Sequence, residues 1–424
     1  MSGRLFCQLW KKNTPRLRQD GLKSVSLALL FFSFAAIHGV EQNDPREVFL
    51  RKELPKYENK NFCLVTNQAG LGRYLLWPPL QDGEPTRLHE IFKDSSNRLG
   101  EVFTAEHGLS GQESEEGNNL PLLYNPKSIY RLRESDIAFY IQACDVIVYD
   151  LPDAGVRPYT YRTIATTLLR SLHQHGPEKI FHLIDVPNPA SHLGIAGPVA
   201  QKEKFSILGE EEIPHLPYYT YGELLQYYVF KMQLRVKLYV QPLNGYRPGR
   251  FFLEQRFSYY PPSPNLPHFR SLQCYWMMVF FEGTYLEEGR GTKDPFCTFG
   301  HPEFDPRDVP PPMGGVLFVP FSFVPSSGRY KNKLVHGYRL EIPDPWEYRP
   351  VEAAYKLLLY LKKRYPELNL FKTYPGGYYS LDELCGTESL RRAVQSEIPY
   401  EEWLKNEKPK IELFRKNMKQ HRIY

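Results

Sequence analysis

The chain has 424 residues, of which 42% are hydrophobic and 24% charged, a composition typical of a folded globular protein. Its formal net charge of +5 is carried by residues 1–39, which hold six cations and one acid, so the remainder is neutral. Because nucleic-acid-binding domains keep basic charge on their folded part, this distribution argues against a nucleic acid as partner.

The N-terminal 39 residues have the pattern of an export signal. A basic leader runs into an apolar segment over residues 24–39. This segment is shorter than the roughly 20 residues that a membrane span needs. We predict a signal peptide over 1–39, with a retained membrane anchor as the alternative, and a linker over 40–60. The expected location is the periplasm or the outside of the cell.

Next along the chain, four apolar runs each end in polar or glycine residues. They cover residues 62–70, 98–108, 144–155 and 179–189. Helical spacing follows in 160–176 and 219–232, and another strand-like run covers 236–243. This alternation predicts a Rossmann-like parallel sheet over 61–244. The GxGxxG fingerprint of dinucleotide-binding proteins is absent after the first strand, so we predict no cofactor.

The composition changes after about residue 244, where proline and tyrosine become frequent and the alternation of strand-like and helical segments ends. We predict a smaller α+β auxiliary domain over 245–424, with helices at 351–366 and, as a charged surface helix, within 400–424. Ligands of open parallel sheets bind beyond the carboxyl ends of the strands. The expected active site therefore lies in the cleft between the two domains.

The five cysteines beyond the leader are widely spaced, and none forms a CxxC motif or a cluster with histidine. Neither a metal site nor a dense disulfide framework is indicated. Cys63 and Cys144 lie in apolar runs, and we predict that they are buried thiols.

The stretch FTAEHGLSG places Glu106 and His107 where an apolar run meets a glycine-containing loop. Apolar neighbours raise the pKa of a carboxyl group, which suits a catalytic acid. The alternative is an acid that caps the next helix.

The stretch YDLPDAGVRPYTY concentrates polar and aromatic groups in one strand-to-helix connection: Asp150, Asp153, Arg157, Tyr159 and Tyr161. A cation beside a carboxylate suits an acidic sugar. The alternative is a structural ion pair between Asp153 and Arg157.

Two later stretches complete the set of candidates. PPSPNLP is a rigid loop that presents Ser263 and Asn265, because proline fixes its backbone. FEGTYLEEGRGTKDPF combines three glycines with charged residues, among them Glu282, Glu287, Glu288 and Arg290. Glycines permit close approach of the backbone to a ligand, whereas the alternative is a flexible surface loop.

Taken together, these motifs resemble one family. TNQAG, AEHGLSG, YDLPDAGVRPYTY, DVPNP, GPV, PPSPNLP and FEGTYLEEGRGT occur in the order found in NamZ-type exo-β-N-acetylmuramidases, over about residues 60–340. The resemblance implies a glycoside hydrolase that releases N-acetylmuramic acid from the non-reducing end of peptidoglycan fragments. It also implies a Rossmann-like domain joined to an auxiliary domain, and peptidoglycan-derived sugars as partners.

The resemblance also implies roles for individual residues. Glu106 is the expected general acid, and Asp153, Glu282 or Asp150 the base or stabiliser, unless the substrate's own acetamido group acts as nucleophile. The remaining candidates contact substrate: Arg157 or Arg290 at the lactyl carboxylate, Asn67, Asn188 and Asn265 at hydroxyls, Tyr159 and Tyr161 in the pocket wall, with His107, Asp150 and Ser263 nearby.

The chain departs from the family pattern at two places. Val186 replaces an arginine, and Leu216, Pro217 and Tyr218 replace a second motif that contains a cation. The exact sugar preference is therefore open. A non-catalytic cell-wall carbohydrate-binding protein on the same fold is the alternative function, and a metal-dependent hydrolase or esterase is a third.

Overall fold

The computed structural model describes most of the chain beyond the leader: residues 45–67, 69, 98–106, 108, 127–129, 132–255 and 257–424. The predicted signal peptide and His107 lie outside these residues.

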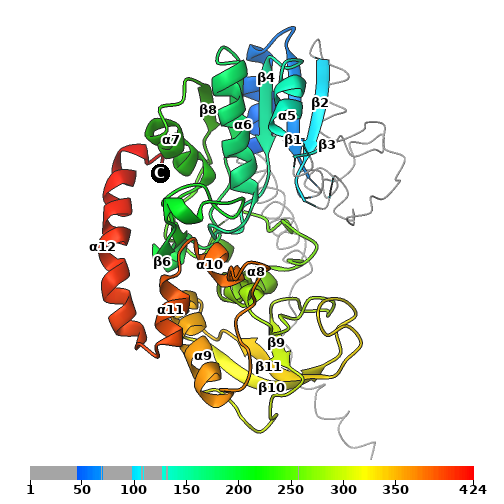
Figure 1. The fold of residues 1–424 in the computed structure, drawn as a ribbon. Helices are drawn as coiled ribbons and strands as arrows, with labels where there is room; N and C mark the ends of the chain where they lie inside the picture. The colour runs from blue at the N-terminus through cyan, green and yellow to red at the C-terminus, as the bar shows by residue number, and fades with distance from the viewer. Residues whose placement is uncertain are drawn as a thin grey trace, which may run out of the picture.

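The N-terminal part is built on a six-stranded sheet in the order β3-β2-β1-β4-β5-β8. All neighbouring strands are parallel, which confirms the predicted sheet (Figure 1). The strands are β1 (Asn61–Thr66), β2 (Arg98–Thr104), β3 (Lys127–Ser128), β4 (Val146–Asp150), β5 (Ile180–Ile184) and β8 (Lys237–Gln241). The strand order reverses between β1 and β4, and such a switch point opens a ligand-binding crevice at the carboxyl ends of the strands.

Both faces of this sheet are covered, which explains why its central strands are mostly apolar. Helices α5 (Glu134–Ile141) and α6 (Tyr161–His175) lie on one face, and the buried Ile164, Leu168 and Leu172 follow the predicted helical spacing. On the other face, a helical segment starting with α2 (Pro45–Val48) and running to residue 56 buries Phe49 against β1 and β4. This part of the predicted linker is therefore folded.

Helix α7 (Tyr221–Lys231) confirms the second predicted helix and packs beside α6 and β8. Its first turn is capped by Thr220, whose hydroxyl accepts a hydrogen bond from the backbone of Glu223 (3.3 Å). A short antiparallel ribbon of β6 (Ala196–Val199) and β7 (Pro214–Leu216) precedes this helix.

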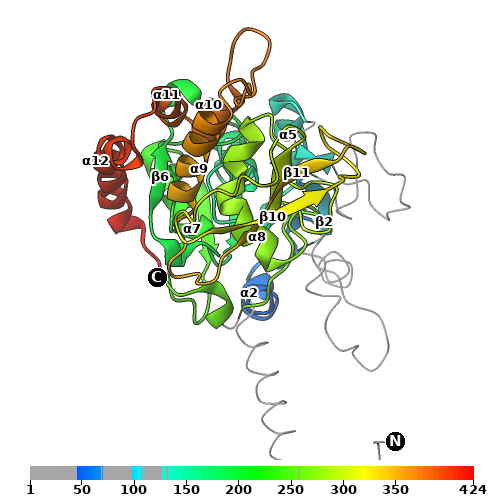
Figure 2. The same cartoon turned by 90° about the horizontal axis from the view of Figure 1, so that it is seen from below.

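The C-terminal part contains a three-stranded antiparallel sheet in the order β10-β11-β9. Its strands are β9 (Thr298–His301), β10 (Leu317–Phe323) and β11 (Val335–Glu341). The helices are α8 (Phe269–Met278), α9 (Pro350–Arg364), α10 (Ser380–Cys385), α11 (Ser389–Gln395) and α12 (Tyr400–Met418). Seen from below, the turn that precedes α10 projects from the rest of the molecule (Figure 2). This α+β region agrees with the predicted fold class.

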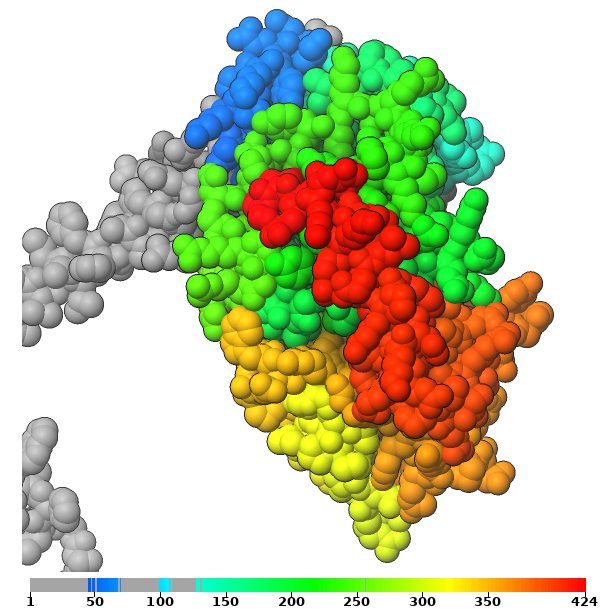
Figure 3. All heavy atoms as spheres, turned by 90° about the vertical axis from the view of Figure 1, so that its left-hand side faces the viewer, coloured from blue at the N-terminus to red at the C-terminus, as the bar shows by residue number. Residues whose placement is uncertain are grey.

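The two parts share one continuous apolar core, and the end of the chain ties them together. Helix α12 crosses from the C-terminal part to the N-terminal part (Figure 3). Its buried Phe414 and Met418 pack against the cluster around Tyr227 of α7. Beyond it, the Tyr424 hydroxyl donates a hydrogen bond to Asp185 (2.9 Å). The predicted surface helix therefore has a buried apolar face that fixes the position of both parts.

Among the described helices, none combines the length and the apolar character that crossing a membrane requires.

The prediction that Cys63 and Cys144 are thiols is wrong, because they form a disulfide. Both side chains are buried, as predicted. Cys63 lies in β1 and Cys144 lies two residues before β4, so the pairing of these two parallel strands brings together residues 81 positions apart. Their spacing in the sequence gave no indication of this contact.

Candidate active site

Asn67, the first residue after β1, joins three segments at the carboxyl edge of the sheet. Its side-chain amide donates hydrogen bonds to the Tyr161 hydroxyl (3.1 Å) and to the backbone carbonyl of Pro262 (3.3 Å). Its oxygen accepts a hydrogen bond from the backbone of Ala69 (3.0 Å). Because its donors and acceptor are engaged and the side chain is fully buried, Asn67 fixes the wall of the crevice.

Tyr161, at the start of α6, reinforces this wall. Its hydroxyl donates a hydrogen bond to the Pro262 carbonyl (2.8 Å), and its ring centroid lies 4.6 Å from that of Tyr159. The pKa of Tyr161 is raised to about 12; burial is the largest cause, and the negative charge of Glu106 contributes to the increase. Glu106 is therefore close to Tyr161.

Glu106 lies two residues beyond the end of β2, and its side chain is exposed to solvent. Its charge also raises the pKa of Glu282, although burial of Glu282 is the largest cause of that increase. Glu282 belongs to the C-terminal part, in the helical turn that follows α8. The fold thus brings two of the predicted catalytic carboxylates together, although they are far apart in the sequence.

Arg290 holds this second carboxylate in place. Its guanidinium forms ion pairs with both Glu282 and Glu288, and its Cζ atom lies 4.8 Å from the ring centroid of Phe296. An arginine shared by two carboxylates favours their ionised forms. Glu282 is therefore suited to act as a base or as a stabiliser of positive charge.

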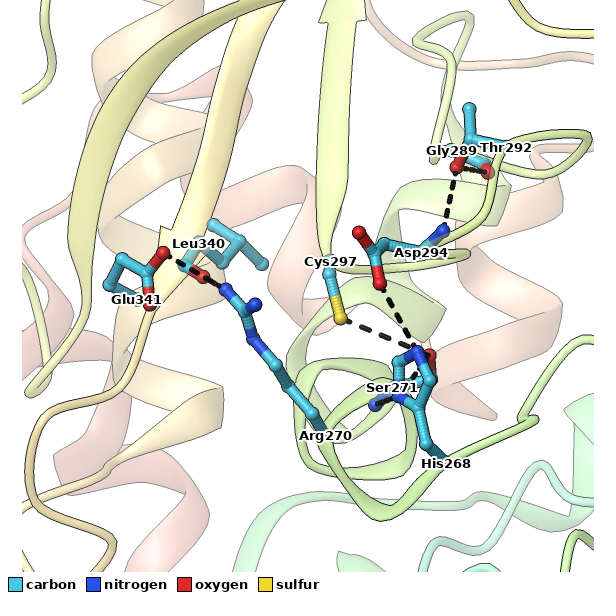
Figure 4. A network of polar contacts seen from close by, with 9 residues as sticks. All are labelled: His268, Arg270, Ser271, Gly289, Thr292, Asp294, Cys297, Leu340 and Glu341. Atoms are coloured by element: carbon cyan, nitrogen blue, oxygen red, sulfur yellow. Dashed lines mark hydrogen bonds and ion pairs between the residues drawn. The ribbon is translucent and has the colours of Figure 1, made fainter.

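The loop that carries Arg290 is anchored to the start of α8 (Figure 4). The Asp294 carboxylate lies 3.2 Å from Nε2 of His268, and Nδ1 of His268 accepts a hydrogen bond from the backbone of Ser271 (3.1 Å). At the other end of the loop, Gly289 has a φ of +80° and lies so close to Thr298 that no side chain would fit. This loop is held at both ends, unlike the flexible loop considered as the alternative.

A cavity of about 360 Å³ adjoins these charged groups. Its lining includes Leu208, Glu282, Glu287, Glu288 and Arg290, together with Arg329, Lys372 and Tyr374. Glu287 is almost fully buried there, and burial raises its pKa to about 7. The cavity is large enough for a sugar unit and contains both acids and cations.

Three predicted residues from the strand-to-helix connection are engaged within the protein. Both carboxylate oxygens of the buried Asp150 accept hydrogen bonds from Arg46, one of them over 2.7 Å. Arg157 is buried and donates to the carbonyls of Leu208 (3.2 Å) and Leu384 (2.7 Å). Asp153 accepts a hydrogen bond from the backbone of Gly155 (2.8 Å) and forms no ion pair with Arg157.

The remaining predicted residues stabilise turns. The Asn188 amide donates to the carbonyl of Tyr219 (2.9 Å), and its oxygen accepts from the backbone of Ala190 (2.9 Å). The Ser263 hydroxyl accepts a hydrogen bond from the backbone of Asn265 (3.2 Å), and the Asn265 side chain is partly exposed. Their roles in substrate binding stay predictions, as does that of His107.

Asp153 leads to a prediction about stability. Burial raises its pKa to about 7, far above the value of about 4 expected in the unfolded chain. A raised pKa in the folded state means that stability present at low pH is lost as the pH rises toward 7. Replacing Asp153 by asparagine removes this penalty, so we expect the free energy of unfolding at pH 8 to rise by about 1–3 kcal/mol. Denaturant unfolding measures this gain, which should shrink toward pH 4.

An equal change in the free energy of unfolding at pH 8 and at pH 4 would contradict this prediction. Such a result would mean that the effect of the substitution does not come from the ionisation of Asp153.

Sequence reasoning missed the cations in the lining of the cavity, Arg329 and Lys372, and the partner of Asp150, Arg46. No motif marks these residues, and each reaches its position only through the fold. In the described part of the chain, no group of three or more histidine, cysteine or acidic residues could hold a metal ion.

Comparison with protein families agrees with this arrangement. The family described as the N-terminal part of exo-β-N-acetylmuramidase NamZ matches residues 62–270, and the one described as its C-terminal part matches 273–424. The chain belongs to the NamZ family. It is thereby a member of a family of glycoside hydrolases, which confirms the resemblance inferred from the motifs. The predicted domain boundary at 244/245 stays a prediction.

Individual relatives support the same assignment. The peptidoglycan β-N-acetylmuramidase NamZ of Bacillus subtilis strain 168 is 25% identical over 386 residues, which cover 88% of this chain and 89% of the relative. Crystal structures of two DUF1343 family proteins of Bacteroides fragilis have the same fold, with TM-scores of 0.76 and 0.68 at 21% and 22% identity. Each alignment covers 90% of this chain and 98% of the solved chain.

Proposed function

We propose that the protein is an exo-β-N-acetylmuramidase, which hydrolyses β-1,4-linked N-acetylmuramic acid from the non-reducing end of peptidoglycan fragments. The Bacillus subtilis relative is named as a peptidoglycan β-N-acetylmuramidase. Within this chain, the observation that carries the proposal is the approach of Glu106, from the sheet edge, to Glu282 of the C-terminal part. Two carboxylates flanking one site are what most glycoside hydrolases use.

The two carboxylates differ in environment, and this difference suggests their roles. Glu106 is exposed at the end of β2, where it can reach the glycosidic oxygen and donate a proton to it. Glu282 is paired with Arg290, whose charge opposes the increase in pKa that burial causes, and this pairing suits it to activate a water molecule or to stabilise the positive charge that develops on the sugar ring. Asp150 and Asp153 are occupied by internal hydrogen bonds and would support the wall of the site.

The decisive experiment offers the purified protein a MurNAc–GlcNAc disaccharide and, in parallel, longer fragments that carry N-acetylmuramic acid at the non-reducing end. Free N-acetylmuramic acid, detected by mass spectrometry, is the expected first product from both. Release of larger fragments from within the chain would contradict the exo mode. Binding of the fragments without any release would instead support the carbohydrate-binding alternative.

Export to the periplasm or the cell exterior is part of the proposal. The leader has the pattern of a signal peptide, and disulfides such as Cys63–Cys144 form mainly in oxidising, extracytoplasmic compartments. Mass spectrometry of the protein from exporting cells should find an N-terminus near residue 40. A mature chain that still begins at Met1 and stays in the cytoplasm would contradict export.

A further inference from the structure

Two basic side chains that line the cavity, Arg329 and Lys372, form no ion pair with any carboxylate in the described part of the chain. Each lies against an aromatic ring instead. The Cζ atom of Arg329 lies 4.6 Å from the ring centroid of Tyr285, and Nζ of Lys372 lies 5.4 Å from that of Tyr374. Such contacts hold a cation in place without neutralising its charge.

The backbone brings both cations close to Tyr285. Lys372 donates its amide to the carbonyl of Gly283 (3.0 Å), so it lies beside the segment that contains Tyr285. Tyr330, the residue after Arg329, donates its hydroxyl to the Tyr285 carbonyl (3.1 Å). A hydrogen bond from Thr373 is the largest cause of the lowered pKa of Tyr285, and the charges of Arg329 and Lys372 lower it further. Both cations thus approach the same phenol.

None of the three acids that line the described cavity forms an ion pair with either cation. Glu282 and Glu288 share Arg290. The third acid, Glu287, accepts a hydrogen bond from the backbone of Tyr330 (3.2 Å), and its other oxygen is buried without a hydrogen-bond partner. Burial is the largest cause of the increase in the pKa of Glu287 to about 7, and the charges of Arg290 and Arg329 oppose this increase.

The two cations predicted to meet a substrate carboxylate are not free to do so. Arg157 is buried behind the cavity wall, where it donates to the carbonyls of Leu208 and Leu384. Arg290 is held between Glu282 and Glu288. A carboxylate that enters the cavity would meet Arg329 and Lys372 instead.

We propose that Arg329 and Lys372 form a subsite that binds a carboxylate carried by the muramic acid unit of the substrate. This carboxylate belongs either to the lactyl ether of the sugar or to a peptide joined to that ether. The subsite would distinguish N-acetylmuramic acid from N-acetylglucosamine, which has no lactyl group. The inference rests on the proposed function, because it assigns the substrate of the same cavity.

The test compares binding of three sugars by calorimetry: N-acetylmuramic acid, the same sugar bearing a dipeptide, and N-acetylglucosamine. The variant is Arg329→Gln combined with Lys372→Met, in the full protein. Two charge-assisted contacts are lost, so we expect the Kd for the acidic sugar to rise about 10- to 100-fold. The preference over N-acetylglucosamine should nearly disappear. Added salt should raise the Kd of the unmodified protein for the acidic sugar, because salt screens the attraction between charges. The same addition should raise the Kd of the variant less.

Lys333→Met is the matched control, because Lys333 is an exposed lysine of the same loop that does not line the cavity. It should leave all three values of Kd unchanged. If the dipeptide-bearing sugar alone loses affinity in the double variant, the peptide supplies the carboxylate; if the simple sugar loses it too, the lactyl group does. Both outcomes support the subsite.

An unchanged preference for the acidic sugar in the double variant would overturn the subsite, even if the protein hydrolyses muramic acid substrates. Conversely, a lost preference in a protein that hydrolyses no sugar would support the subsite and contradict the proposed function. Binding and hydrolysis therefore test the two proposals separately.

Discussion

Replacing Glu106 by glutamine is expected to lower kcat for the MurNAc–GlcNAc disaccharide by about 10²- to 10⁴-fold, with little change in substrate binding. Glutamine has nearly the same shape as glutamate but carries no proton that it can transfer to the leaving oxygen. Because Glu106 is exposed, we expect the circular dichroism and thermal unfolding of the variant to match those of the unmodified protein. Initial rates of sugar release measure the effect.

A better leaving group makes this test specific for an acid. An aryl glycoside of N-acetylmuramic acid needs little protonation to depart, so the deficit of Glu106→Gln should shrink with that substrate. Glu282→Gln should be impaired with both substrates, because a base or stabiliser acts on the sugar ring and not on the leaving group. An equal deficit of Glu106→Gln with both substrates would contradict its role as the acid.

Glu101→Gln is the matched control on the same strand. Glu101 lies in β2 and pairs with Lys127 at 2.5 Å, on the partly exposed surface of the sheet. A partly exposed ion pair contributes little to stability. The Glu101 variant should therefore keep both its activity and its unfolding temperature.

The main features of the fold were predictable from periodicity alone. The run from Val146 to Tyr149 in β4 is apolar at every position, a pattern typical of a strand covered on both faces. The spacing of Ile164, Leu168 and Leu172 likewise predicts the helix that covers one of those faces. Local pattern sufficed here because each element is recognised by the side chains it buries.

The site was predictable only in part, because its contacts join distant segments. That Glu106 ends a strand follows from the sequence, but its approach to Glu282 depends on how the C-terminal part packs on the sheet edge. The same packing leaves Arg329 and Lys372 beside the cavity, where no motif indicates them. The Cys63–Cys144 disulfide was missed for the same reason, since it depends on the pairing of β1 with β4.

Asp150 shows how a residue can resemble a binding group yet be engaged by the fold. It ends β4 at the point where the strand order reverses, a position where ligand-binding side chains are expected. Its partner is Arg46 of α2, which lies before the region matched by the NamZ family. The motif that contains Asp150 therefore does not reveal that its carboxylate is already paired.

Replacing Asp150 by asparagine is expected to lower the free energy of unfolding by about 3–5 kcal/mol, because the substitution leaves the charge of Arg46 buried without its carboxylate. Thermal unfolding measures this loss, which corresponds to a decrease in Tm of roughly 6–12 °C. A second variant, Arg46→Met with Asp150→Leu, removes both charges together and should recover much of the lost stability, since an apolar pair of similar size needs no buried counter-charge.

Activity at low temperature then separates the two roles of Asp150. If this carboxylate only supports the sheet edge, Asp150→Asn should hydrolyse the disaccharide at nearly the normal rate at 15 °C, where the variant is still folded, and lose activity near its lowered Tm. A large increase in KM at 15 °C with an intact fold would instead assign Asp150 to the substrate, as the sequence motif suggested. The ion pair with Arg46 favours the first result, because both carboxylate oxygens already accept hydrogen bonds from the guanidinium.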